Sequence, residues 1–227
     1  LDPKYHNERL IPPEVSPDIY ECQQVVPVNN VLQGALVQVY KLSDLNNPIG
    51  RDKTPWDYAR PVTKKLVEKQ KIAASQTLLF PQPSDLSPDV PVKAKPDKND
   101  IKKPVVNESS LVVGSDAVEV NDLFVGATVE IYYEQGGTRE SIGRNLAKWP
   151  GTIFQVKPLK AAWATCPDCI KADQSLCEIT VTGAGKPVKN YLNPLVILNP
   201  VCDGSSAFTV CQTVFNSPLT IFREGNP

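Results

Sequence analysis

The chain has 227 residues, of which 41% are hydrophobic and 22% are charged, a balance typical of a globular protein with room for two domains. Its 24 basic and 25 acidic residues give a formal net charge of -1, which offers no electrostatic reason to expect binding to nucleic acid. No uninterrupted apolar stretch is long enough to cross a membrane as a helix. Because the chain begins at Leu1 and contains no methionine, we expect it to be a fragment of a longer exported protein.

An internal repeat with a period of roughly ninety residues organises the chain. Residues 26–40 (VPVNNVLQGALVQVY) are similar to residues 118–132 (VEVNDLFVGATVEIY) in their alternating apolar positions and in a Gly-Ala pair after a short turn. Further matches follow in the same order: Ile49-Gly50 with Ile142-Gly143, Trp56 with Trp149, and Gln76 with Gln174. Residues 214–222 (VFNSPLTIF) begin the pattern a third time, so we expect two full units and the start of another.

Each unit is predicted to consist of β-strands. Residues 37–40 and 129–132 alternate apolar and polar side chains, which turns one side of each strand toward a core and the other toward water. The 22 prolines favour short strands joined by turns. Several short strands in a unit of about ninety residues indicate a two-sheet sandwich close in size to an immunoglobulin domain.

We therefore expect an all-β chain of tandem immunoglobulin-like β-sandwich domains. The expected divisions are an extended N-terminal segment (1–19), a first repeat (20–95), a linker rich in proline and lysine (96–106), a second repeat (107–198), and the opening strands of an incomplete third repeat (199–227). Strands without a completed sheet expose unpaired edges, so we expect the third repeat either to dock onto the second unit or to pair with another chain in self-association.

The order of these repeated motifs resembles the bacterial immunoglobulin-like repeats of secreted and cell-surface proteins, including adhesins. The resemblance rests on the Gly-Ala pair and its strand, the Ile-Gly pair, the tryptophan and the later glutamine, and it covers residues 20–227. It implies a sandwich fold and a role in spacing, display or adhesion. It implies no catalytic residue, cofactor or metal.

Six cysteines are candidates for disulfide bonds in an oxidising compartment: Cys22, Cys166, Cys169, Cys177, Cys202 and Cys211. We expect Cys166 to pair with Cys169, Cys177 to pair with Cys202 or Cys211, and Cys22 to take the remaining partner. Two alternatives stay open: a redox-active Cys-Pro-Asp-Cys motif, and a zinc site drawn from the five C-terminal cysteines. Disulfides are favoured because the motif leads into a strand, and because structural zinc usually requires two close cysteine pairs.

The three tryptophans are the candidate ligand contacts. Trp56 and Trp149 occupy equivalent repeat positions, and a repeated aromatic is expected to pack in the core of each sandwich; sugar stacking is the alternative. Trp163 has no equivalent in the first repeat and lies near the cysteine pair, so it is the better candidate of the three for an exposed aromatic contact.

No constellation of catalytic residues is apparent in the sequence. The sole histidine, His6, lies outside the repeats, and no glycine-rich nucleotide-binding motif occurs. We expect a non-enzymatic structural or adhesive module of a secreted or cell-surface protein, with a protein or glycan partner, without nucleic acid and without direct membrane insertion. The alternative is a carbohydrate-binding module that uses exposed tryptophans.

Overall fold

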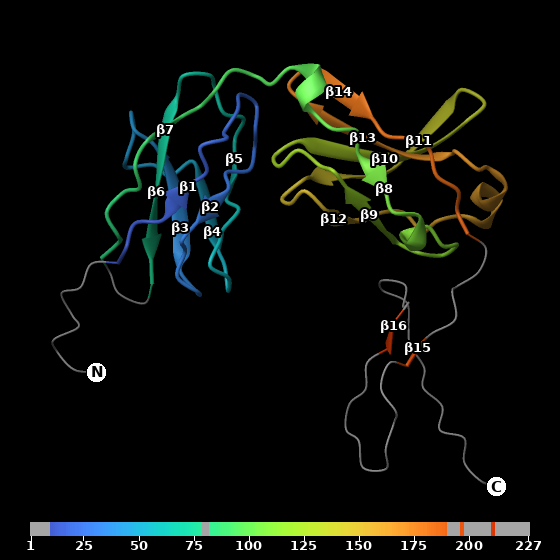
Figure 1. The fold of residues 1–227 in the computed structure, drawn as a ribbon, viewed down its shortest axis with the longest axis horizontal. Helices are drawn as coiled ribbons and strands as arrows, with labels where there is room; N and C mark the ends of the chain where they lie inside the picture. The colour runs from blue at the N-terminus through green and yellow to red at the C-terminus, as the bar shows by residue number, and fades with distance from the viewer. Residues whose placement is uncertain (1–9, 79–81, 190–195, 198–209, 212–227) are drawn as a thin grey trace, which may run out of the picture.

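The computed structural model describes residues 10–78, 82–189, 196–197 and 210–211. Two β-sandwiches follow one another along the chain and lie side by side (Figure 1). Each has its own hydrophobic core. The prediction of an all-β chain with tandem immunoglobulin-like sandwiches is therefore confirmed.

The first sandwich pairs an antiparallel five-stranded sheet with a shorter facing layer. The order across the sheet is β5 (Val62–Thr63), β4 (Gly50–Lys53), β3 (Leu36–Lys41), β6 (Lys71–Thr77) and β7 (Val90–Pro91). The facing layer contains β1 (Glu14–Val15) and β2 (Val28–Asn29), and reciprocal backbone hydrogen bonds between Val28 and Ala59 extend it. Aliphatic side chains from both layers form the core, among them Val15, Ile19, Val26, Val28, Val37, Val39, Ile72 and Ala74.

The second sandwich packs a four-stranded sheet against a three-stranded one. The larger sheet has the order β11 (Thr138–Leu146), β10 (Thr128–Gln135), β13 (Ile170–Leu176) and β14 (Ile179–Thr182). The smaller has the order β12 (Thr152–Gln155), β9 (Ala117–Asn121) and β8 (Val105–Val106). Short 3-10 helices η2 (Lys98–Asp100), η3 (Glu108–Ser110) and η4 (Ala161–Thr165) lie in the connections. The core includes Leu111, Val118, Val120, Val129, Ile131, Phe154, Leu159 and Ile170.

Some sandwich elements fall in stretches that were expected to precede or connect the repeats. Strand β1 lies within residues 1–19, and β8 lies within residues 96–106. Of the expected third repeat, the structure describes only β16 (Val210–Cys211), which pairs with β15 (Val196–Ile197). His6, Cys202 and the rest of that repeat lie outside the described residues.

A buried glutamine makes the same set of hydrogen bonds in both sandwiches. Gln76 on β6 accepts a hydrogen bond from the backbone N–H of Leu32 (2.7 Å) and donates to the carbonyls of Asn30 (3.2 Å) and Ile11 (2.7 Å). Gln174 on β13 accepts from Phe124 N (2.7 Å) and donates to the carbonyls of Asp122 and Lys102. Both side chains are essentially inaccessible to water. Because an unpaired buried amide is costly, each glutamine fixes a turn and the incoming chain segment against a central strand.

The repeated Ile-Gly pair has a steric cause. A Cβ on Gly50 would lie 2.7 Å from Thr63 Cγ2 and 2.9 Å from Val62 O. A Cβ on Gly143 would lie 2.7 Å from Val156 Cγ1 and 2.9 Å from Gln155 O. In both sandwiches, the next segment of the chain therefore passes very close to the strand that carries the glycine. Only glycine leaves room for that approach.

The glutamine bonds predict a matched pair of stability effects. We expect Gln76→Leu and Gln174→Leu each to lower the free energy of unfolding by about 2–4 kcal/mol, because several buried backbone groups lose their partners. Chemical denaturation measures this loss. Gln33→Leu, at an exposed position, is the control and is expected to change stability by less than about 0.5 kcal/mol. Equal stability of all three variants would contradict the structural role of the glutamines.

Candidate binding surface at the junction of the two sandwiches

A disulfide joins the two sandwiches. Cys22 precedes β2 of the first sandwich, and Cys177 occupies the turn between β13 and β14 of the second; their Cα atoms are 5.4 Å apart. Both residues have positive φ (63° and 54°), which places each in a tight turn. The expected pairing of Cys177 with Cys202 or Cys211 is therefore wrong. The repeat pattern could not show this pairing, because the two cysteines occupy unrelated positions in their units.

Apolar side chains surround this disulfide and form a small third core at the junction. Ile101, Leu176 and Val181 are buried there, and Cys22, Phe124 and Ile179 pack against them. Tyr20 of the first sandwich meets Phe124 of the second edge to face, with ring centroids 5.6 Å apart. The connecting segment, the first sandwich and the β13–β14 hairpin thus share buried surface, which opposes independent movement of the two sandwiches.

Gly126 allows the two backbones to meet. Its carbonyl accepts a hydrogen bond from Gln24 N across the junction (3.3 Å), and its φ is +87°. A Cβ at this position would overlap the Gln23 side chain and lie 3.1 Å from the backbone nitrogens of Gln24 and Val25. Gly34, the equivalent residue of the first repeat, has a similar φ of +82° but nothing within 4 Å of such a Cβ. Gly126 therefore has a junction-specific role that Gly34 lacks.

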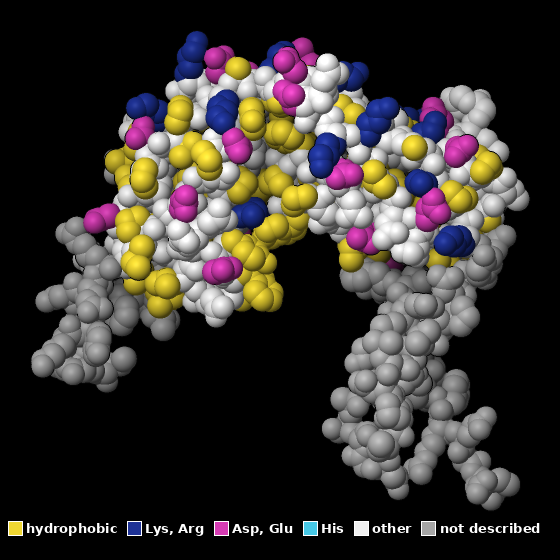
Figure 2. Space-filling view, in the orientation of Figure 1, with side chains coloured by type: hydrophobic (Ala, Val, Ile, Leu, Met, Phe, Trp, Pro, Cys, Tyr) yellow, Lys and Arg dark blue, Asp and Glu magenta, His cyan; other side chains and the backbone are white. Residues whose placement is uncertain are grey.

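A second set of contacts consists of aromatic rings and one arginine. Tyr58 meets Trp149 edge to face across the junction, with centroids 4.9 Å apart and an interplanar angle of 75°. The Arg60 guanidinium lies 4.4 Å from the Trp149 ring centroid and 5.5 Å from that of Tyr58. Trp56 stacks on Tyr58 at 6.3 Å and 16°. Figure 2 shows hydrophobic side chains gathered where the two sandwiches meet.

The structure reverses the predicted environments of the tryptophans. Trp56 is 57% exposed and Trp149 is only partly buried, so neither packs in a sandwich core as expected. Trp56 lies in the loop between β4 and β5, and Trp149 lies in the equivalent loop between β11 and β12. Trp163, the better candidate for an exposed contact, is only 3% exposed because η4 turns it into the second core, where it stacks on Tyr133 at 4.8 Å.

Sequence reasoning missed Tyr58 and Arg60 as members of this surface. The available signal was the alternation in Trp56-Asp57-Tyr58-Ala59-Arg60, because in an extended segment alternate residues point to the same side. That signal shows a shared face but not the partner sandwich, so the contact with Trp149 had to come from the structure.

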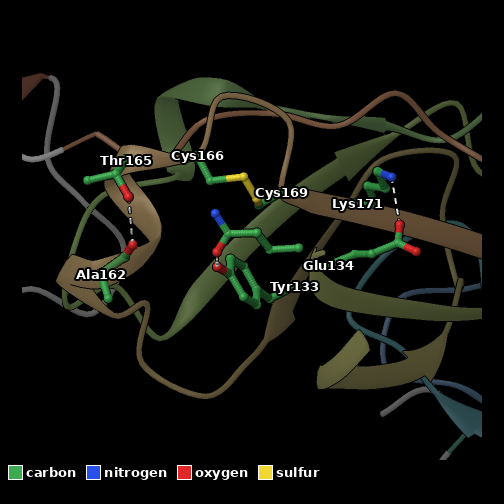
Figure 3. Close-up of a disulfide and its surroundings, with 8 residues drawn as sticks. Tyr133, Glu134, Ala162, Thr165, Cys166, Cys169 and Lys171 are labelled. Carbon is green, nitrogen blue, oxygen red and sulfur yellow. Dashed lines mark hydrogen bonds and ion pairs between the residues drawn. A yellow bond between two sulfur atoms is a disulfide. The ribbon is translucent and has the colours of Figure 1, made fainter. Parts of the chain in front are cut away.

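The Cys166–Cys169 disulfide lies away from the junction and is shown in Figure 3. It links the end of η4 to the start of β13, with Tyr133 and the Glu134–Lys171 ion pair (2.6 Å) nearby. Cys166 follows the C-terminal end of η4, where a helix dipole does not stabilise a thiolate. The geometry therefore lacks the feature that activates a redox-active Cys-x-x-Cys motif.

Other kinds of site find no support in the part of the chain that the structure describes. The zinc alternative would need thiolates, but Cys166, Cys169 and Cys177 are bound in disulfides. Within the described ranges, no group of three or more histidine, cysteine, aspartate or glutamate side chains is arranged to hold a metal ion. A search of those same residues finds no helix with the length and apolar character needed to span a bilayer.

The outer face of the larger second sheet carries a polar network that includes a buried tyrosine. Tyr132 donates a hydrogen bond to Asp173 (3.0 Å), and Arg139 binds both Asp173 (2.9 Å) and Glu130 (2.6 Å) while covering the Tyr132 ring. Burial, followed by the bond to Asp173, raises the pKa of Tyr132 to about 12. These groups are mutually satisfied, which indicates a structural role for the network.

Comparisons with known proteins give no family assignment. No protein-family model matches the sequence, and no curated protein matches it. Among solved structures, the chain is similar to a biofilm-associated protein, BSP domain (14% identity, TM-score 0.33), over 81% of this chain and 30% of that one. It is also similar to the human OSCAR ligand-binding domain (9%, TM-score 0.33, 78% and 96% covered) and to a two-domain fibronectin type III segment of chicken tenascin (12%, TM-score 0.27, 77% and 97% covered). The assignment of the fold rests on the sheets and cores described above.

The two equivalent glycines provide a test of the junction. We expect Gly34→Ala to destabilise the protein by about 1–2 kcal/mol through its left-handed backbone alone. Gly126→Ala carries the same backbone cost, and the clash with Gln23 should add at least about 1 kcal/mol. Chemical denaturation compares the two. Equal losses would mean that the close approach at Gly126 does not contribute to stability.

Tyr132 predicts a loss of stability at alkaline pH. Its pKa is higher in the folded protein than the ordinary value of about 10, so the folded state holds the proton more tightly than the unfolded state. The contribution of Tyr132 to the free energy of unfolding is therefore complete below about pH 10 and declines as the pH rises toward about 12. Denaturation at a series of alkaline pH values should show a shallower decline for Tyr132→Phe than for the wild type. Parallel declines would contradict the raised pKa.

Proposed function

We propose that this chain is a non-enzymatic structural and adhesive module of an exported or cell-surface protein, in which two sandwiches are held as one rigid body to present a binding surface. The observation that carries the proposal is the Cys22–Cys177 disulfide with the apolar cluster around it. Immunoglobulin-like units connected only by a linker can reorient, whereas a covalent bond and shared buried side chains oppose that motion.

An exported location is supported by the same chemistry. Disulfides persist in oxidising compartments and are rare where thiols are kept reduced. Two bonds are formed by Cys22, Cys177, Cys166 and Cys169. The second bond lies within one sandwich, so it stabilises that unit without affecting the arrangement of the two.

A binding role is favoured over a purely passive spacer by the surface beside the disulfide. Trp56 exposes a large ring, and Trp149 and Tyr58 bring both sandwiches into the same aromatic group. Exposed aromatic side chains held by their neighbours are typical of recognition surfaces. The proposed rigid junction therefore also carries an aromatic surface to which both sandwiches contribute.

Nuclear spin relaxation tests whether the junction is rigid. In the wild type, backbone amides of both sandwiches should report one shared rotational correlation time. The double variant Cys22→Ser/Cys177→Ser should give shorter and unequal correlation times, because the covalent link is lost. Cys166→Ser/Cys169→Ser is the matched control, since it removes a disulfide within one sandwich and should leave the shared time unchanged. Separate correlation times in the wild type would reject the rigid module.

A further inference from the structure

One end of each sandwich is built from the same glycine turn and the same tryptophan loop. The backbone N–H of Gly34 donates a 2.7 Å hydrogen bond to Thr54 O in the first sandwich, and that of Gly126 donates a 2.7 Å bond to Ala147 O in the second. Both glycines have positive φ, and a tryptophan follows two residues after each acceptor. We call this part of each sandwich its tryptophan end. Because the two ends share one backbone framework, their surroundings can be compared position by position.

The tryptophan end of the second sandwich is covered by the first sandwich. The contacts fall on three positions: Tyr20 on Phe124, the Gln24 N–H at Gly126 O, and Tyr58 with Arg60 on Trp149. As a result Gly126 is buried, and Phe124 and Trp149 are only partly exposed. The tryptophan end is therefore the part of a sandwich that receives a neighbouring sandwich.

The tryptophan end of the first sandwich presents the same three positions to solvent. Leu32 stands at the position of Phe124 and is 40% exposed, and Trp56 is 57% exposed. Gly34 is exposed, and no atom lies within 4 Å of a Cβ built on it. Since the backbone framework is the same in both sandwiches, the difference in exposure reflects the neighbour that covers the second one.

The chain also enters both tryptophan ends along the same path. The buried glutamine of each sandwich donates a hydrogen bond to the entering segment, at Ile11 O in the first and at Lys102 O in the second. Ile101 directly precedes the second of these acceptors and is buried in the apolar cluster at the junction. Leu10 holds the same place in the first sandwich but is partly exposed. A sandwich connected through the segment before Leu10 would therefore be directed to this end, with Leu10 as the apolar side chain between them.

We propose that the tryptophan end of the first sandwich is a docking surface for a further immunoglobulin-like sandwich, which precedes Leu10 in the same polypeptide. The partner places an aromatic ring over Leu32, a backbone N–H at Gly34 O, and a tyrosine–arginine pair on Trp56. The receiving end and the covering surface are different parts of a sandwich, so the contact is head-to-tail and can repeat. The proposal rests on the proposed function, because it names the partner of the exposed Trp56 ring.

An extended chain tests the proposal. A second copy of residues 10–100 replaces residues 1–9, so that the added copy is joined to Leu10 as the first sandwich is joined to Ile101. The first sandwich has a hydrophobic core of its own, so the added copy is expected to fold. Within the added copy, Cys22→Ser avoids an unpaired thiol and Trp56→Phe removes the extra indole. Acrylamide quenching of the original Trp56 is then obtained as the difference from a variant that lacks it.

We expect the quenching constant of Trp56 to fall about twofold or more in the extended chain, because a docked surface excludes water from the ring. Tyr58→Ala/Arg60→Ala in the added copy should restore the value of the original chain. Leu45→Ala in the added copy is the matched control, since it truncates an exposed side chain in the loop between β3 and β4, and it should leave the protection intact.

Unchanged quenching in the extended chain would overturn the proposal. Equal protection by the Tyr58→Ala/Arg60→Ala copy would overturn it as well, because the ring would then be covered without the contacts seen at the junction. Leu32→Glu in the original first sandwich is a second check: its side chain is exposed, and the variant should restore quenching in the extended chain.

Spin relaxation of the unextended chain separates failure of this docking surface from failure of the proposed function. One shared correlation time together with an unprotected Trp56 in the extended chain would reject the docking surface alone. Separate correlation times of the two sandwiches would reject the rigid module itself.

Discussion

The Cys22–Cys177 disulfide is the constraint on which the arrangement of this molecule depends. It connects a turn at the start of the first sandwich to a hairpin near the end of the second, over a sequence separation of 155 residues. Each sandwich has its own core, so either fold is accounted for without it. The bond instead holds a surface of the first sandwich against a surface of the second, which the disulfide within the second sandwich does not do. The apolar cluster and the Arg60–Trp149 contact form where these two surfaces are held together.

Within each sandwich, repeated residues mark the places where backbone geometry is demanding. Gln76 and Gln174 complete the hydrogen bonding of a buried turn, and Gly50 and Gly143 permit the close approach of the next segment of the chain. These residues could be identified from the sequence because the same physical requirement occurs twice at the same place in the unit. The alternating strands could also be predicted, since a two-sided sheet imposes a period of two on its side chains.

The junction could not be predicted in the same way. Several of its residues have no counterpart in the other unit: no cysteine occupies the position equivalent to Cys22, and Tyr58 and Arg60 have no equivalents in the second unit. The tryptophans show most clearly what the repeat pattern cannot predict. A repeated aromatic suggested a core position, but Trp56 and Trp149 lie in loops between strands, and the unrepeated Trp163 fills a core instead. Whether an aromatic side chain points inward depends on the local turn, which composition and spacing do not specify.

The position of the disulfide also determines how tension would pass through the chain. A pull that enters before Cys22 and leaves after Cys177 is transmitted through the sulfur–sulfur bond, and the residues between them bear no load. The central strands β3, β6, β10 and β13 lie inside this closed loop, whereas β1, β14, β15 and β16 lie outside it. The loop withholds roughly 500 Å of contour length from stretching, given about 3.3 Å for each extended residue. Under tension the strands outside the loop would therefore unfold first, while the strands inside it stay folded until the disulfide is reduced.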